Sequence, residues 1–115
     1  MRNLILGFAV VAAFTPASAA DYAPINRRDA AEPALYEICH NYSLGQKEAR
    51  MATLYGIATS LVPMGRRGEL NDTQRDWLAE RERCGADASC LFDVYDRGIR
   101  RLNGVIDDIA SRGPY

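Results

Sequence analysis

The fold is decided by residues 74–102, which read QRDWLAERERCGADASCLFDVYDRGIRRL. Before Gly85-Ala86-Asp87, one face at helical spacing contains Gln74, Trp77, Leu78 and Arg81, and after it an apolar stripe contains Leu91, Val94, Tyr95, Ile99 and Leu102. This spacing places the side chains on one face of an α-helix, and the glycine-containing break separates one helix from the next. The sequence therefore predicts one helix over Leu70–Cys84 and a second over Ala88–Ser111.

Two more helices are predicted upstream. A short helix begins at Pro33, a residue suited to a first helical turn, and its stripe is Leu35, Ile38, Cys39 and Tyr42. A longer helix capped by Ser43 ends at Pro63, and its stripe is Leu44, Met51, Leu54, Tyr55, Ala58, Leu61 and Val62. Between Met64 and Glu69, two glycines around two arginines indicate an exposed loop.

No stretch alternates with a period of two, so the sequence predicts an all-α fold, a small bundle of about four helices. We expect its core to contain Leu54, Tyr55, Trp77, Leu78, Val94, Tyr95, Ile99 and Leu102.

The N-terminal segment is typical of an exported protein. Arg2 precedes an apolar run from Leu4 to Phe14 and the small residues 17–20, which is the layout of a secretory signal peptide. We therefore expect a signal peptide over 1–20, a flexible leader over 21–31, and a helical domain over 32–115. The apolar run is too short for a stable membrane span. The expected product is periplasmic or secreted and has no membrane anchor after cleavage.

Composition argues against several classes of function. The chain has 14 basic and 15 acidic side chains and a net charge of −1, without the basic excess of a nucleic-acid binder. Its single histidine, His40, makes a zinc site improbable. Adjacent helical residues point about 100° apart, so Cys39 and His40 do not face each other as nucleophile and base. We expect no enzyme activity, no cofactor and no nucleic-acid partner.

The three cysteines suggest a cross-link. A disulfide between Cys84 and Cys90 would clamp the corner of a helical hairpin and contribute roughly 2 kcal/mol, because the loop that it closes is short. Cys39 would then be left over. Three cysteines permit three single pairings, and their spacing leaves that choice open.

One motif resembles a known family. Gln74, Trp77, Leu78, Arg81 and Cys84, followed by Cys90-Leu91, Tyr95, Ile99 and Leu102, match the pattern Q-x-x-W-L-x-x-R-x-x-C, a short loop, C-L and Y-x-x-x-I-x-x-L. This pattern resembles the N-terminal domain of the LprI-type lysozyme inhibitors. Upstream, Ile38-Cys39, Leu44, Glu48, Met51 and Tyr55 look like further family positions. Lys47 and Gly98 depart from it, since the family usually has an apolar residue and arginine there.

The resemblance implies a pairing and structural roles. Family members usually carry a further cysteine near the mature N-terminus, and residues 21–31 have none, which implies a Cys84–Cys90 bridge and an unpaired Cys39. The motif residues with expected structural roles are Tyr55, Gln74, Trp77, Leu78, Arg81, Leu91 and Tyr95. We expect Arg81 to cover Trp77, and the hydroxyls of Tyr55 and Tyr95 to reach the rim of the bundle.

The same resemblance implies a binding function. It predicts a non-catalytic protein that inhibits lysozyme by occluding the cleft of the enzyme, with Asp87 and Ser89 of the clamped corner as candidate contacts. Arg66 and Arg67 are further candidates for contact with a target. The alternative is an envelope interaction or assembly module, as a monomer or as a dimer linked through Cys39.

Overall fold

The computed structural model describes residues 32–112, which form four α-helices without a β-strand. The helices are α1 (Pro33–His40), α2 (Tyr42–Leu61), α3 (Met64–Arg83) and α4 (Ala88–Ser111). The prediction of an all-α bundle of about four helices is confirmed. The expected signal peptide and leader lie outside the described residues.

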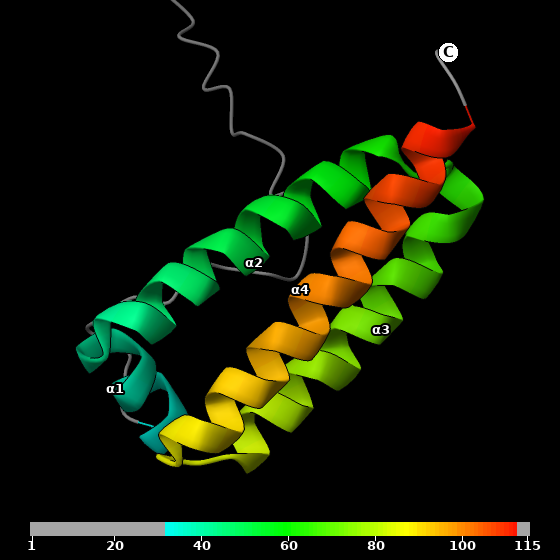
Figure 1. Ribbon diagram of the computed structural model, residues 1–115. Coiled ribbons are helices and arrows are strands. Elements are labelled where there is room, and N and C mark those ends of the chain that lie inside the picture. The colour runs from blue at the N-terminus through cyan, green and yellow to red at the C-terminus, as the bar shows by residue number, and fades with distance from the viewer. Residues whose placement is uncertain (1–31, 113–115) are drawn as a thin grey trace, which may run out of the picture.

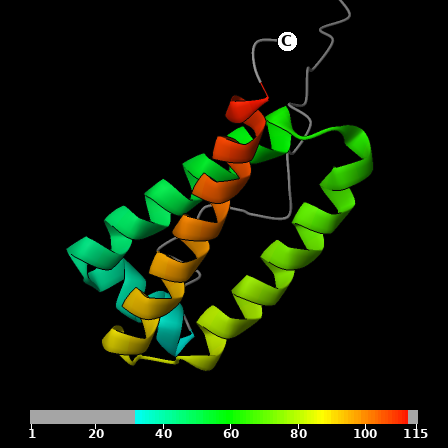
Figure 2. The ribbon, with the colours of Figure 1, turned by 45° about the vertical axis from the view of Figure 1, so that its right-hand side comes forward.

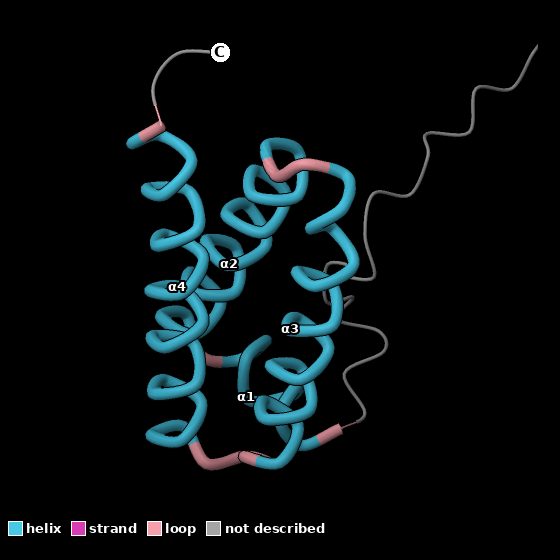
Figure 3. Tube along the Cα trace, turned by 90° about the vertical axis from the view of Figure 1, so that its right-hand side faces the viewer, coloured by secondary structure: helices cyan, strands magenta, loops and turns pink. Residues whose placement is uncertain are grey.

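The three long helices run alternately up and down the bundle, and α1 lies across one end of it (Figures 1 and 3). We call this the closed end; there α1 packs on α2 and α3, and the turn from Cys84 to Asp87 joins α3 to α4. At the opposite, open end, which holds Leu61, Met64 and Ser111, α3 leans away from α4 (Figure 2). The two ends therefore differ in how closely the helices approach.

A continuous apolar core lies between the helices. Its buried members are Ala34, Ile38, Leu44, Met51, Tyr55, Ala58, Val62, Leu70, Trp77, Leu91, Val94, Tyr95, Ile99 and Leu102. Each large apolar side chain that is fully buried contributes about 1.5–3 kcal/mol. Six of the eight predicted core residues are buried, whereas Leu54 and Leu78 lie partly exposed at its edge.

Helix α3 contributes only a narrow stripe to this core. Its buried residues are Leu70, Gln74, Trp77 and Arg81, spaced by four, three and four positions. Such a seven-residue repeat keeps one seam of a helix against its neighbours. Two of the four side chains are polar, so α3 buries little apolar surface.

The loop predicted over Met64–Glu69 is wrong, because these residues form the first turns of α3. Val62 ends α2 in an extended conformation, and Pro63 is the N-cap of α3, with its carbonyl accepting the N–H of Arg66 at 2.9 Å, so the next helix begins at once. Glycine costs only about 1 kcal/mol relative to alanine inside a helix. Two exposed glycines therefore do not stop a helix that continues into the buried stripe of α3.

The start and end of α2 also differ from expectation. Asn41, and not Ser43, caps this helix, because its side-chain oxygen accepts the N–H of Leu44 at 3.2 Å. Tyr42 therefore belongs to α2 and is 80% exposed, outside the predicted stripe of the first helix. Leu61 at the other end is 51% exposed and outside the core.

Candidate functional site

The corner between α3 and α4 is covalently closed. Cys84 and Cys90 form a disulfide with an S–S distance of 2.03 Å and a Cα–Cα distance of 5.5 Å, which confirms the predicted bridge. Gly85 has φ of +56°, a conformation that suits glycine because it has no Cβ. Gly85 lies two residues after the end of α3. It belongs to the short loop that joins α3 to α4 (Figure 3).

Asp87 and Ser89 are both exposed at this corner. Asp87 is also the N-cap of α4, since its Oδ1 accepts the N–H of Cys90 at 3.1 Å. A carboxylate has two acceptor oxygens, so the cap leaves Asp87 able to bind a second donor. A shallow hollow of about 440 Å³, lined in part by Cys84, Cys90 and Arg97, lies beside the bridge.

The other predicted contact residues lie far from this corner. Arg66 and Arg67 are exposed in the first turns of α3, at the open end. A 20-residue helix is about 30 Å long, so the length of α3 separates them from Asp87 and Ser89. The structure therefore does not bring the four candidates into one compact site.

A buried polar cluster lies inside the closed half of the bundle. Nη1 of Arg81 lies 3.4 Å from Oε2 of Glu48, and only 8% and 11% of these two side chains is exposed. The Tyr95 hydroxyl donates to the same Glu48 oxygen. Burial, and then the charge of Glu48, raises the pKa of Tyr95, so this hydroxyl keeps its proton. The expectation that it reaches the rim is wrong.

Arg81 has further partners in this cluster. Its Nε and Nη2 donate to Oε1 of Glu82 at 3.0 and 2.8 Å. Its guanidinium also lies 5.7 Å from the ring centre of Trp77, which agrees with the predicted stacking. A buried cation is tolerated where carboxylates and hydrogen bonds surround it, so the arginine of the motif has a structural role.

Trp77 is held in place by α4. Its Nε1 donates to the Val94 carbonyl at 2.8 Å, and its ring meets the edge of Tyr95 with centres 5.1 Å apart. A Cβ added to Gly98 would lie 2.4 Å from that Nε1 and 2.3 Å from Cε of Met51. This close approach leaves no room for a side chain at Gly98.

The remaining motif residues also pack within the bundle. Leu91 is fully buried, and the Tyr55 hydroxyl donates to Asn71 of α3. Gln74 is 2% exposed and accepts a hydrogen bond from Nη2 of Arg101 at 3.0 Å. Lys47 pairs with Asp96 of α4 at 2.5 Å. This ion pair joins α2 to α4.

Cys39 is a free cysteine and is half-buried. It lines a hollow of about 330 Å³ at the α1–α2 corner, together with Ile38 and Tyr42. Among residues 32–112, no group of three or more histidine, cysteine and acidic side chains is placed to hold a metal ion.

Comparison of the chain with protein-family models, curated proteins and solved structures gives no match. The resemblance to the LprI-type domain stays a prediction from the motif. None of the described helices is both long and apolar enough to cross a membrane.

Proposed function

We propose that this chain is an exported, non-catalytic binding protein that inhibits a lysozyme by occluding its cleft. The observation that carries the proposal is the exposed α3–α4 corner, which the Cys84–Cys90 disulfide fixes. The motif resemblance supports the same function. A disulfide is typical of proteins in oxidising compartments, which agrees with export.

The corner suits insertion into a cleft. Association costs less when the inserted segment is already ordered, and here the bridge, the turn at Gly85 and the Asp87 cap all restrict the backbone. The tip residues are small, since Gly85 and Ala86 precede Asp87. Asp87 and Ser89 would supply hydrogen bonds to groups that line the cleft.

Charge also favours this class of target. Lysozymes of the animal type are basic, and this chain has a net charge of −1, so its field does not oppose their approach. Asp87 would bind a donor near the cleft, whereas Arg66 and Arg67 at the open end lie outside a small contact centred on the corner.

The first experiment measures lysis of a peptidoglycan suspension by a basic animal-type lysozyme. The protein is produced from Met1 in a bacterium with an outer membrane and recovered from the periplasm. We expect dose-dependent loss of lysis at near-stoichiometric protein and a 1:1 complex in calorimetry. Mass spectrometry of the product tests export, with a first residue at Ala20 or Asp21 expected.

Asp87→Asn tests the contact without removing the helix cap, because asparagine is also a good N-cap residue. We expect this change to weaken inhibition, while Asp76→Asn, at an exposed position on α3, leaves it unchanged. Full lysis in the presence of a large excess of protein would overturn the proposal. Self-association that is lost in Cys39→Ser, without any effect on lysis, would favour the assembly module instead.

A further inference from the structure

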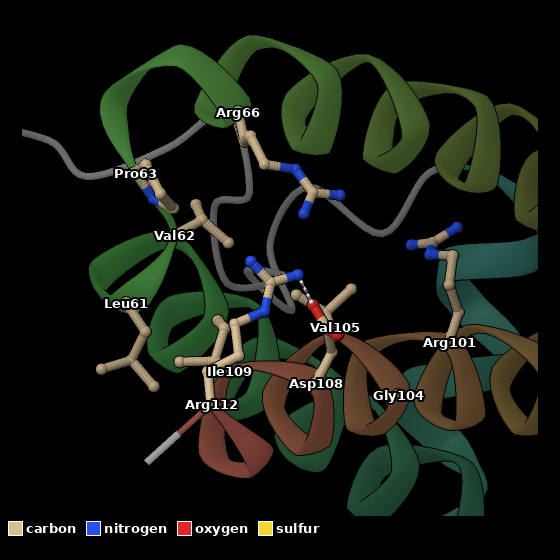
Figure 4. A pocket seen from close by; sticks show the side chains of 10 residues that line it. All are labelled: Leu61, Val62, Pro63, Arg66, Arg101, Gly104, Val105, Asp108, Ile109 and Arg112. Carbon is tan, nitrogen blue, oxygen red and sulfur yellow. Dashed lines mark hydrogen bonds and ion pairs between the residues drawn. The ribbon is translucent and has the colours of Figure 1, made fainter. Parts of the chain in front are cut away.

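A groove opens at the end of the bundle that is remote from the proposed lysozyme contact. It lies between the last turn of α2, the first turns of α3 and the C-terminal half of α4, and its volume is about 600 Å³ (Figure 4). Val62, Val105 and Ile109 give it an apolar floor. A smaller hollow of about 210 Å³ adjoins it and shares Val62 and Val105 among its lining residues.

The sequence explains why no side chain of the bundle fills this groove. All residues from Met64 to Glu69 are exposed, so the first turns of α3 send no apolar side chain toward α4. Gly104 of α4 lines the groove, and a Cβ built on it would meet no atom within 4 Å. The groove therefore stays open because α3 directs no apolar side chain into it and α4 has a glycine there.

Three arginines surround the apolar floor. Arg66 extends from α3, and Arg101 and Arg112 extend from α4 (Figure 4). Asp108 pairs with Arg112 at 2.6 Å, and the exposed Glu69 forms a longer ion pair with Arg66 at 3.8 Å. The groove thus holds more positive than negative charge.

Arg101 is the most enclosed of the three. Its Nη2 donates to Gln74, but its Nε is buried and has no hydrogen-bond partner within residues 32–112. Burial lowers the pKa of this guanidinium, because removal from water disfavours the charged form. An anion beside Arg101 would compensate this loss of hydration.

We propose that this groove binds a single-chain amphiphile with an anionic head, of the fatty-acid type. Its alkyl chain lies on Val62, Val105 and Ile109, and its carboxylate accepts hydrogen bonds from Arg66 and Arg101. Charge-assisted hydrogen bonds of this kind are the strong ones, and the volume falls within the range of small-molecule sites. This inference is independent of the proposed inhibition of lysozyme.

The walls of the groove favour an alkyl chain over an extended peptide. They come mostly from three α-helices, whose backbone N–H and C=O groups bond within each helix except at the helix ends. A peptide that binds in extended form needs unpaired backbone groups along its site, as at the edge of a β-sheet. An alkyl chain needs none.

Calorimetry with decanoate, dodecanoate and uncharged decan-1-ol, below their aggregation limits, tests the proposal. Each buried methylene contributes about 0.8 kcal/mol, so two more methylenes should lower Kd about fifteenfold for dodecanoate. Decan-1-ol should bind several-fold more weakly than decanoate. Equal affinity for the two head groups, or no binding of dodecanoate, would overturn the proposal.

Variants locate the binding. Arg66→Gln should raise the Kd of dodecanoate about fivefold. Its neighbour Arg67 does not line the groove, so Arg67→Gln should leave the Kd unchanged. Gly104→Phe should abolish binding by filling the space, while Gly104→Ala should bind nearly as the parent does.

Circular dichroism and thermal unfolding establish that each variant is folded. Unchanged binding by Gly104→Phe would overturn the proposal. So would a dimer in sedimentation that Gly104→Phe dissociates, because the groove would then accept a second copy of the chain.

Discussion

The two ends of the bundle are built from different chemistry. At the closed end, the Cys84–Cys90 disulfide and the buried pair of Arg81 and Glu48 join the helices. At the open end, all residues in the first turns of α3 are exposed, and an apolar groove separates them from α4. One sequence thus combines a cross-linked end with an end where a groove lies between two helices.

The difference shows where α3 obtains its stability. Half of its buried stripe is polar, so hydrogen bonds and ion pairs at Gln74 and Arg81 supplement the apolar contacts of Leu70 and Trp77. Buried polar groups stabilise a fold only while they remain paired. The closed end should therefore be the more sensitive to substitution.

The largest expected effect is at Arg81. Arg81→Met leaves Glu48 buried without its cation, and we expect a loss of about 3–5 kcal/mol in the free energy of unfolding. Urea unfolding followed by circular dichroism measures it. Adding Glu48→Gln removes the stranded charge but keeps an oxygen for Tyr95, so part of the loss should be recovered. The exposed Arg100→Met should cost less than about 0.5 kcal/mol, and an equal loss there would contradict this account.

The next effect compares two glycines of α4. Gly98→Ala pushes a Cβ into Trp77 and Met51, and we expect a loss of about 2 kcal/mol. Gly104→Ala meets open space and should gain about 0.5–1 kcal/mol from helix propensity. Urea unfolding measures both changes, and fluorescence of the single tryptophan should shift only in Gly98→Ala. A stable Gly98→Ala would show that Trp77 can move without cost.

Removal of the Cys84–Cys90 bridge should reduce stability by no more than Gly98→Ala does, and mainly at the closed end. Replacing Cys84 and Cys90 with alanine should cost about 2 kcal/mol, because the closed loop is short. Amide hydrogen exchange should accelerate most around residues 81–92. Amides near Val105 should accelerate only as far as the loss of global stability requires. Uniform acceleration over all helices would show that the bridge acts on the whole bundle.

The smallest effect concerns pH. The Glu32 carboxyl faces Glu82, and the hydrogen bond and repulsion between them raise the pKa of Glu32. The hydrogen bond between protonated Glu32 and Glu82 stabilises the fold at acid pH. Because the pKa of Glu32 is raised in the folded state, this stabilisation is lost as the pH rises through that pKa. Glu32→Gln should therefore raise Tm slightly at pH 7, with a difference that shrinks on acidification. Asp76→Asn is the control, and a pH-independent difference would contradict the assignment.

The sequence predicts the elements that have strong apolar periodicity. The prediction of α4 over Ala88–Ser111 is correct, as is the burial of Trp77 and Tyr95, because their spacing follows one helical face. The first turns of α3 were not predictable from that signal, since Met64–Glu69 bury nothing. The two glycines indicated a loop there. The packing of the buried stripe of α3, which begins at Leu70, outweighs the small helix-propensity cost of these glycines.

The candidate sites were predictable only in part. The spacing of the cysteines allowed a disulfide at the Cys84–Cys90 corner, but the choice of this pairing followed from the motif resemblance. The partnership of Arg81 with Glu48 joins residues 33 positions apart on different helices, and nothing local in the sequence specifies it. The groove results from side chains that are missing at Gly104 and turned outward in α3, and that space becomes visible only after the helices have docked.

The position of the disulfide also bears on the order of folding. Cys84 and Cys90 are separated by six positions, and loops of that size close within about 10–100 ns. Their thiols therefore meet long before distant helices dock, and oxidation requires only the α3–α4 turn. Cys39 belongs to α1 and reaches either partner only through a much longer loop. The lower entropy cost of closing the shorter loop therefore favours the Cys84–Cys90 bridge during oxidation.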